Sequence, residues 1–200
     1  MRRLGVREST KARGGIIATD DQHKTQIVQV VDYDPTWPLM FEEIKQAIEI
    51  QLGIWAVTVE HVGSTAVPGL AAKPIIDLDI VIASETDLPR VTFLLGELGY
   101  VHLGDLGIDG REAFGRPTSD IPRLGESRQW FSHHLYVCTK ESQELRRHIG
   151  FREYLRGNPS EASKYGTLKR QLALQYRYDI DGYVEGKSTF IAGALSRISI

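Results

Sequence analysis

The chain has 200 residues, of which 42% are hydrophobic and 25% are charged, and its formal net charge is −2. This composition is ordinary for a folded domain and gives no overall positive field, so we expect no nucleic-acid partner. A single cysteine, Cys138, excludes a disulfide framework or a cysteine-rich zinc site within the chain. No stretch reaches the ~20 apolar residues that cross a bilayer, so we expect a cytoplasmic protein without a membrane partner.

The N-terminal part begins irregularly and then becomes periodic. Residues 1–26 are polar and aperiodic, and we expect them to form a flexible leader ahead of one domain at 27–200. Asp34 followed by Pro35 suits the start of a helix, with the aspartate as its N-cap. Apolar residues at helical spacing then predict a helix that ends near Leu52.

The rest of the chain predicts a sheet followed by helices. Strands are expected at 27–31, 54–60, 75–83, 100–103, 112–115 and 133–138, and further helices at 87–98, 141–156, 160–178 and 182–198. Interleaved strands and helices followed by three helices indicate an α/β (α+β) fold: a mixed β-sheet with flanking helices and a C-terminal helical layer.

Two aspartates, Asp77 and Asp79, alternate along the predicted strand at 75–83. Side chains two residues apart on a strand share a face, roughly 6–7 Å apart along it. Apolar neighbours on both faces indicate a central strand, where two unpaired carboxylates would repel each other and lose hydration. We therefore predict both as catalytic ligands of Mg²⁺ or Mn²⁺. The alternative is a partly solvated edge strand that needs no metal.

Gly63 and Ser64 end the strand before this one, and a short connector separates them from the aspartates. The bare backbone amides and the hydroxyl of such a turn suit a phosphate group. Together with the two carboxylates they fit metal-dependent nucleotidyl transfer, in which metal ions neutralise the attacking and leaving oxygens. An ordinary Gly-Ser turn is the alternative.

The stretch EHVGSTAVPGLAAKPIID at residues 60–77 strongly resembles the GrpB family, a branch of the nucleotidyltransferase-fold superfamily. The resemblance covers residues 27–198 and includes YDPTWP (33–38), SHHLYV (132–137), FREYLR (151–156), YGTLK (165–169) and KSTFI (187–191). It implies a nucleotidyltransferase-like α/β sheet, in which Gly63, Ser64, Asp77 and Asp79 match the superfamily's Gly-Ser and Asp-x-Asp positions.

Active members of this superfamily usually place a third carboxylate on a later strand, which corresponds here to residues 132–138. That segment contains no Asp or Glu, and His133, His134 and Tyr136 stand there instead. Adjacent strand residues face opposite sides, and the more polar face favours His134 as a metal ligand or general base. A structural histidine is the alternative, and Glu112 is a fallback acid.

Four basic residues are candidates for an anion pocket. Lys73 lies between the two halves of the motif, Arg111 precedes a predicted strand, and Lys169 and Lys187 occupy family positions on the C-terminal helices. Arginine suits bidentate phosphate recognition, whereas lysine acts as a point charge. A solvated surface cation is the alternative for each.

These features predict an Mg²⁺-dependent nucleotidyltransferase-like protein that transfers a nucleoside monophosphate from an NTP, with ATP expected, to a small-molecule acceptor. Two alternatives stay open. The missing third carboxylate, and the occurrence of GrpB-type domains joined to dephospho-CoA kinase-like domains, favour a non-catalytic nucleotide-binding or CoA-related accessory domain. An ATP-dependent ligase that forms an acyl-adenylate would use the same metal site. The chain has no P-loop motif of its own.

Overall fold

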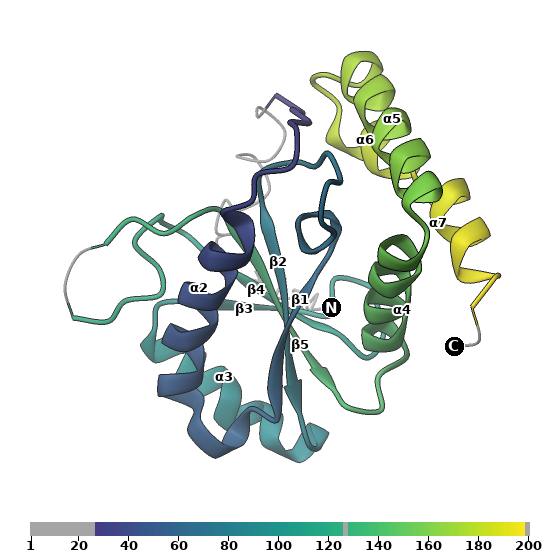
Figure 1. Ribbon diagram of the computed structural model, residues 1–200. Coiled ribbons are helices and arrows are strands. Elements are labelled where there is room, and N and C mark those ends of the chain that lie inside the picture. The colour runs from purple at the N-terminus through teal and green to yellow at the C-terminus, as the bar shows by residue number, and fades with distance from the viewer. Residues whose placement is uncertain (1–26, 126–127, 199–200) are drawn as a thin grey trace, which may run out of the picture.

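The computed structural model describes residues 27–125 and 128–198, so the predicted leader lies outside the described residues. Within the described residues, five strands form one sheet in the order β1-β2-β5-β4-β3 (Figure 1). They are β1 (Thr58–Val62), β2 (Ile76–Ile82), β3 (Val101–Gly104), β4 (Glu112–Gly115) and β5 (His133–Thr139). β2 runs parallel to β5, and the other neighbouring strands are antiparallel, so the sheet is mixed as predicted.

Helices cover both sides of the sheet, with α2 and α3 on one side and α4 to α7 on the other (Figure 1). They are α2 (Trp37–Leu52), α3 (Leu88–Glu97), α4 (Gln143–Gly157), α5 (Pro159–Gln175), α6 (Ile180–Glu185) and α7 (Ser188–Leu195). Short 3₁₀ turns lie at Gly53–Trp55 (η1), Ser64–Ala66 (η2) and Glu85–Asp87 (η3). Within the described ranges, no helix is long and apolar enough to cross a membrane.

Alternation along β2 gives the sheet an apolar face and a polar face. Ile76, Leu78, Ile80 and Ile82 are at most 1% exposed and join the main core with α2 and α3; we call their side the apolar face. The intervening aspartates lie on the opposite, polar face, where the neighbouring Val81 packs with Cys138 of β5 and Leu145 of α4. β2 pairs on both edges, so it is an interior strand, as predicted.

The first helix begins two residues later than predicted. The Asp34 carboxylate accepts hydrogen bonds from the backbone N–H and the hydroxyl of Thr36, at 2.8 and 2.6 Å. These bonds close a turn that includes Pro35, and α2 starts at Trp37 with Thr36 as its N-cap. The predicted capping by Asp34 is therefore wrong, because its side chain is engaged within the turn.

One predicted strand is absent from the described residues and another is shorter than predicted. Residues 27–31 form no strand among the described residues, and only an isolated bridge joins Val31 to Ala72. β1 begins at Thr58, since the preceding residues Gly53–Trp55 form a 3₁₀ turn. Both segments contain the predicted hydrophobic residues, but neighbouring turns limit how many of these residues pair with another strand.

The last predicted helix, at 182–198, is two helices in the structure. α6 ends at Glu185 with Gly186 as its C-cap, and Lys187 caps α7. A Cβ on Gly186 would lie 2.5 Å from Leu172 Cδ2, so glycine allows the end of α6 to approach α5 closely. The break places Lys187 at the junction between the two helices, beside the cavity described next.

Candidate functional site

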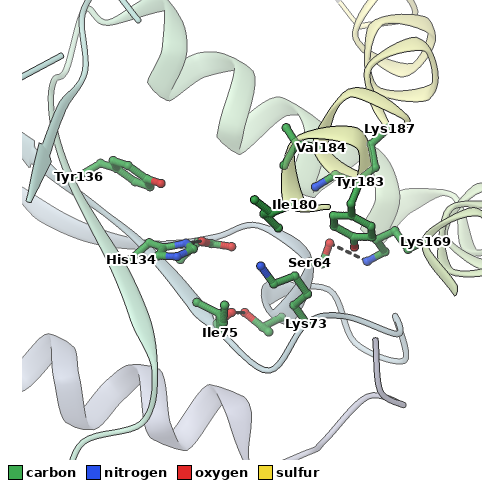
Figure 2. A pocket seen from close by; sticks show the side chains of 12 residues that line it. Ser64, Lys73, Ile75, His134, Tyr136, Lys169, Ile180, Tyr183, Val184 and Lys187 are labelled. Carbon is green, nitrogen blue, oxygen red and sulfur yellow. Dashed lines mark hydrogen bonds and ion pairs between the residues drawn. The ribbon is translucent and has the colours of Figure 1, made fainter. Parts of the chain in front are cut away.

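A cavity of 380 Å³ lies between the polar face of the sheet and the C-terminal helices (Figure 2). Six of the predicted site residues line it: Ser64, Lys73, Asp77, His134, Lys169 and Lys187. In Figure 2, His134 and Tyr136 lie on one side, Lys169 and Lys187 lie with Ser64 on the other, and Lys73 lies between them. The fold therefore brings together residues that are separated by more than a hundred positions in the sequence.

Gly63 allows the chain to turn tightly against Asp77. It follows the last residue of β1 and has φ +70°, a conformation that side chains with a Cβ rarely adopt. A Cβ at this position would also collide with Asp77 Oδ2 and would lie 2.9 Å from its Cγ. Glycine is thus required both by the backbone conformation and by the close approach to the carboxylate.

Asp77 and His134 form a pair on neighbouring parallel strands. They are partners in the register of β2 with β5, and His134 Nδ1 donates a hydrogen bond to Asp77 Oδ1 at 2.9 Å. Burial raises the pKa of Asp77, but the hydrogen bond and the charge of His134 outweigh it and leave this pKa below its usual range. Asp77 is therefore an anion that reaches the cavity with its side chain 30% exposed.

Asp79 is placed differently, because it is fully buried and does not line the cavity. His148 of α4 covers it, with Nδ1 donating a hydrogen bond to Asp79 Oδ2 at 2.7 Å. The Nε2 atom of the same ring lies 3.2 Å from Glu144 Oε1, one helical turn earlier. The other carboxylate oxygen of Asp79, Oδ1, is buried and has no hydrogen-bond partner among the described residues.

His148 supplies a positive charge between the carboxylates of Asp79 and Glu144. Burial raises the pKa of Asp79, and the hydrogen bond from His148 opposes that effect. Burial alone would lower the pKa of His148, but its hydrogen bonds to Asp79 and Glu144 raise it to about 9. His148 is therefore an imidazolium at neutral pH, held between two carboxylates.

Sequence reasoning missed both Glu144 and His148. The only local signal is their i, i+4 spacing on a predicted helix, which places them on one helical face. Nothing in the sequence connects that face to Asp79, which is 69 positions away from His148. The contact arises because α4 packs across the polar face, where Leu145 contacts Val81 and Cys138.

The lysine cluster, consisting of Lys73, Lys169 and Lys187, forms the basic side of the cavity. Lys169 is 2% exposed, and its Nζ donates a hydrogen bond to Ser64 Oγ at 2.7 Å. Burial, and then the charge of Lys187, lower the pKa of Lys169 to about 7. Burial and the charge of Lys73 lower the pKa of Lys187 to about 8. Burial also lowers the pKa of Lys73, although the nearby carboxylate of Asp77 opposes this. Burial and mutual repulsion therefore disfavour the charged form of the three amines, and a bound anion would stabilise it.

Arg111 lies one side chain away from the cavity. Its guanidinium carbon is 4.2 Å from the centroid of the Tyr136 ring, and Tyr136, rather than Arg111, lines the cavity. The Nε atom of Arg111 is buried, and no residue of the described ranges forms a hydrogen bond with it. Direct phosphate contact by Arg111 thus stays a prediction, whereas its contact with a cavity residue is observed.

Two other candidates point to the apolar face. His133 Nε2 shares a hydrogen bond of 2.7 Å with the Tyr100 hydroxyl, and burial lowers the pKa of His133 to about 3. Glu112 is the register partner of Val137 and accepts a hydrogen bond from His102 Nε2 at 2.6 Å. The fallback assignment of Glu112 as the site's acid is therefore wrong, because its side chain lies on the opposite face from Asp77.

The carboxylates suit a cation whose remaining ligands come from a substrate. Within the described ranges, no group of three or more His, Cys, Asp or Glu side chains is arranged to bind a metal ion. Mg²⁺ in nucleotide sites takes one or two protein carboxylates and completes its shell with phosphates and water. Asp77 at the cavity and the buried Oδ1 of Asp79 fit that chemistry.

Comparison with known proteins gives the family. The profile of the GrpB family (GrpB protein) matches residues 27–197. The chain is 31% identical to UPF0157 protein YqkA of Bacillus subtilis (strain 168) over 92% of its own length, and it spans about half (50%) of that relative. It is 33% identical to glutamate-rich protein GrpB of Alkalihalophilus pseudofirmus, over 86% of this chain and 95% of the relative. The crystal structure of GrpB from Enterococcus faecalis has a TM-score of 0.71 and 36% identity, and the match covers 84% of this chain and 96% of that one. As its motifs predicted, the chain belongs to the GrpB family.

Proposed function

We propose that this protein binds a nucleoside triphosphate with Mg²⁺ and transfers its nucleoside monophosphate to a small-molecule acceptor. One observation carries the proposal: a single cavity is lined by Asp77 and His134 of the sheet, by Ser64 and Lys73 of the connection between β1 and β2, and by Lys169 and Lys187 of the C-terminal helices. A phosphate chain with a bound divalent cation presents negative charge at one end and a cation at the other. The cavity has complementary groups for both.

The lysine cluster and Ser64 are the groups that would hold the phosphates. Lys169 and Lys187 are crowded cations whose pKa values are lowered to about 7 and about 8, and a polyanion would relieve this crowding. Ser64 adds a hydroxyl, which Lys169 already orients through a hydrogen bond of 2.7 Å. Three amines beside one hydroxyl favour a polyphosphate over a single carboxylate, because successive phosphate groups can each contact an amine.

The carboxylates would hold the metal at the other end. Asp77 and Asp79 project to the same face of β2, and Mg²⁺ bound there would neutralise negative charge on the phosphoryl oxygens and on the leaving oxygen. Asp77 is already an anion at the cavity, held by Gly63 behind it and His134 beside it. These two contacts fix the position of the carboxylate before any ligand arrives.

His134 is the candidate general base in place of a third carboxylate. Its Nδ1 donates a hydrogen bond to Asp77 Oδ1, at 2.9 Å, which orients the ring at the cavity. An acceptor hydroxyl or amine beside the ring would pass its proton to it as its oxygen or nitrogen attacks phosphorus and pyrophosphate leaves. Ile180 and Val184 of α6 add an apolar surface for the acceptor or the nucleobase.

Pyrophosphate release tests the proposal directly. The protein is incubated with each labelled NTP, Mg²⁺ or Mn²⁺ and a metabolite extract, and pyrophosphate and nucleotide adducts are measured. We expect Asp77→Asn to lower the release rate at least about 100-fold, because it removes a metal ligand and the partner of the base. Glu97→Gln on the exposed surface of α3 removes the same charge far from the cavity and should leave the rate unchanged.

The outcomes separate the three candidate activities. Adducts with hydroxyl or amine acceptors would support nucleotidyl transfer, and an acyl-adenylate formed only with carboxylates would instead indicate a ligase. Nucleotide binding without turnover at every metal tried would contradict transfer and leave a binding or accessory domain.

A further inference from the structure

Two arginines of α4 hold the Gly63–Ser64 turn, although neither of them lines the cavity. Arg152 Nη1 donates a hydrogen bond to the main-chain carbonyl of His61, at 2.7 Å. Arg156 donates two hydrogen bonds to the main-chain carbonyl of Ala66, from Nε at 3.0 Å and from Nη2 at 2.7 Å. These carbonyls lie two residues before the turn and two residues after it, so the arginines fix the chain on both sides of the turn.

Both carbonyls lie where regular secondary structure supplies few donors. His61 belongs to β1, which is an edge strand, so only one side of this strand pairs with another strand. Ala66 is the last residue of η2, and the final carbonyls of a helical turn have no N–H partner within it. Arginine side chains can supply the missing donors at such an end. The arginines therefore restrain main-chain groups that the sheet and the 3₁₀ turn leave open.

Glu153 joins the two arginines into one unit. Its Oε1 atom accepts a hydrogen bond from Arg152 Nε at 2.7 Å and another from Arg156 Nη1 at 2.9 Å. Arg152 also donates to Glu60 Oε2 at 2.9 Å, and its side chain is 11% exposed. A planar guanidinium with partners on more than one nitrogen is held in one orientation. The three α4 residues belong to the FREYLR segment (151–156), which sequence reasoning left without a role.

We propose that Arg152 and Arg156 are positioning residues of the phosphate site, and that they hold the Gly63–Ser64 turn in the conformation that receives a polyphosphate. The inference rests on the proposed function, because it takes this turn and the lysine cluster as the phosphate site. The arginines act through the main chain, since neither of them reaches the cavity. A turn that is already fixed loses little conformational freedom when a ligand binds, and this raises the affinity.

The affinity for inorganic triphosphate, measured by calorimetry, tests the proposal without any turnover. We expect Arg152→Gln and Arg156→Gln each to weaken binding about tenfold, because the turn loses a fixed donor. Arg152→Lys should recover most of the affinity, since an ammonium group can still donate to the same carbonyl. Arg146→Gln is the matched control: it removes an arginine of α4 that pairs with Glu141 at 3.2 Å, and it should change the affinity less than about twofold.

Glu153→Ala separates positioning from a simple effect of charge. If charge alone mattered, the loss of a carboxylate near a site for anions would strengthen triphosphate binding. If Glu153 keeps the two arginines in place, its loss should instead weaken binding, by about threefold. The Glu153 side chain is 52% exposed, so we expect the variant to fold, and thermal melting checks this for every variant.

Motion of the turn itself is measured by ¹⁵N relaxation in the absence of ligand. In Arg152→Gln and Arg156→Gln, the order parameters of the Gly63 and Ser64 amides should fall, whereas that of Leu78 in the core should stay the same. A merely structural contact would lower the melting temperature without this selective effect on the turn.

Unchanged triphosphate binding in the two Gln variants, binding by Glu153→Ala that is as tight as or tighter than that of the natural protein, or unchanged order parameters in the turn would overturn the proposal. So would a natural protein that does not bind triphosphate. These results are distinguishable from a failure of the proposed function. If triphosphate binding weakens as expected while no NTP is turned over, the positioning role stands and the transfer activity falls. If pyrophosphate release requires Asp77 but the variants bind triphosphate normally, the activity stands and the positioning role falls.

Discussion

The two faces of one sheet treat similar residues in opposite ways. His133 and His134 are neighbours on β5, yet His133 points to the apolar face and His134 to the polar face. Burial lowers the pKa of His133 to about 3, so its ring is neutral and serves the core through a hydrogen bond to Tyr100. His134 instead pairs with the Asp77 carboxylate at the cavity. Both residues are histidines, so the face of the sheet on which each one lies decides whether it reaches the cavity.

The contrast extends along β2. On the apolar face, Leu78 is fully buried among side chains of α2 and α3 and contributes to stability by removing hydrocarbon from water. On the polar face, Asp77 and Asp79 require compensating charges from elements far away in the sequence. The apolar face therefore contributes most to stability, whereas the polar face holds buried charges that need partners. Substitutions on the apolar face should lower stability, and substitutions on the polar face should lower ligand binding or activity.

The largest expected effect is on the apolar face. Leu78→Ala should reduce the free energy of unfolding by about 2–5 kcal/mol, since it removes buried methyl groups and leaves a cavity. Asp77→Asn should change stability by less than about 1.5 kcal/mol, because its side chain is 30% exposed. Urea denaturation measures both. Equal losses from the two variants would contradict the division of roles between the faces.

Gly63→Ala tests the contact that joins the strand turn to the polar face. We expect the free energy of unfolding to fall by about 2–3 kcal/mol and nucleotide binding to be lost, because the new Cβ would push Asp77 from its position. Gly53→Ala is the matched control: this glycine also has positive φ, +55°, but a Cβ there would meet no atom of the described residues within 4 Å. Gly53→Ala should lower the free energy of unfolding by about 1 kcal/mol and leave nucleotide binding intact. If both variants behave alike, glycine is required at position 63 because of its backbone conformation and not because of the close approach to Asp77.

Burial of the apolar-face histidine, His133, should make the stability of the protein depend on pH. A pKa lowered from 6.5 to about 3 means that His133 contributes stability above pH 6.5, and this contribution is lost as the pH falls toward 3. The free energy of unfolding should therefore drop by about 1–2 kcal/mol between pH 7 and pH 5 from this residue. Imidazole resonances followed by NMR should show His133 neutral down to pH 4 and His148 protonated up to pH 8. Titration of both rings near pH 6.5 would contradict the contrast.

The smallest expected effect concerns anion affinity at the lysine cluster. Lys169 and Lys187 have pKa values of about 7 and about 8, so both gain positive charge as the pH falls from 9 to 6. The affinity for inorganic triphosphate, measured by calorimetry, should rise about tenfold over that range, and Lys169→Met should reduce the rise. Lys140→Met, at an exposed position after β5, should preserve it. An affinity that does not depend on pH would contradict the role of these amines.

Much of the apolar face could be predicted from the sequence, because alternation and helical spacing are local signals. The central position of β2 follows from its apolar residues on both faces, and the turn at Gly63 follows from residue type. The structure places the predicted Asp77 and His134 side by side, as their strands and faces imply.

The remainder depended on contacts between distant segments. His148 reaches Asp79 only because α4 crosses the polar face, and neither residue carries a local sign of the other. The break between α6 and α7 follows from the close packing of Gly186 against Leu172, which a periodic helical pattern does not reveal. The strands of the site could therefore be predicted from the sequence pattern, whereas the partners of its charged side chains depend on tertiary packing.

The division of the cavity between sheet and helical layer has a consequence for the order in which the site forms. Its acidic side is complete once β5 is made, but Lys169 and Lys187 belong to the last segment of the described chain. During synthesis the carboxylates therefore exist for a time without these two amines. A polyphosphate that contacts both sides would fasten the helical layer onto the sheet, so that ligand binding also acts as the final step of assembly.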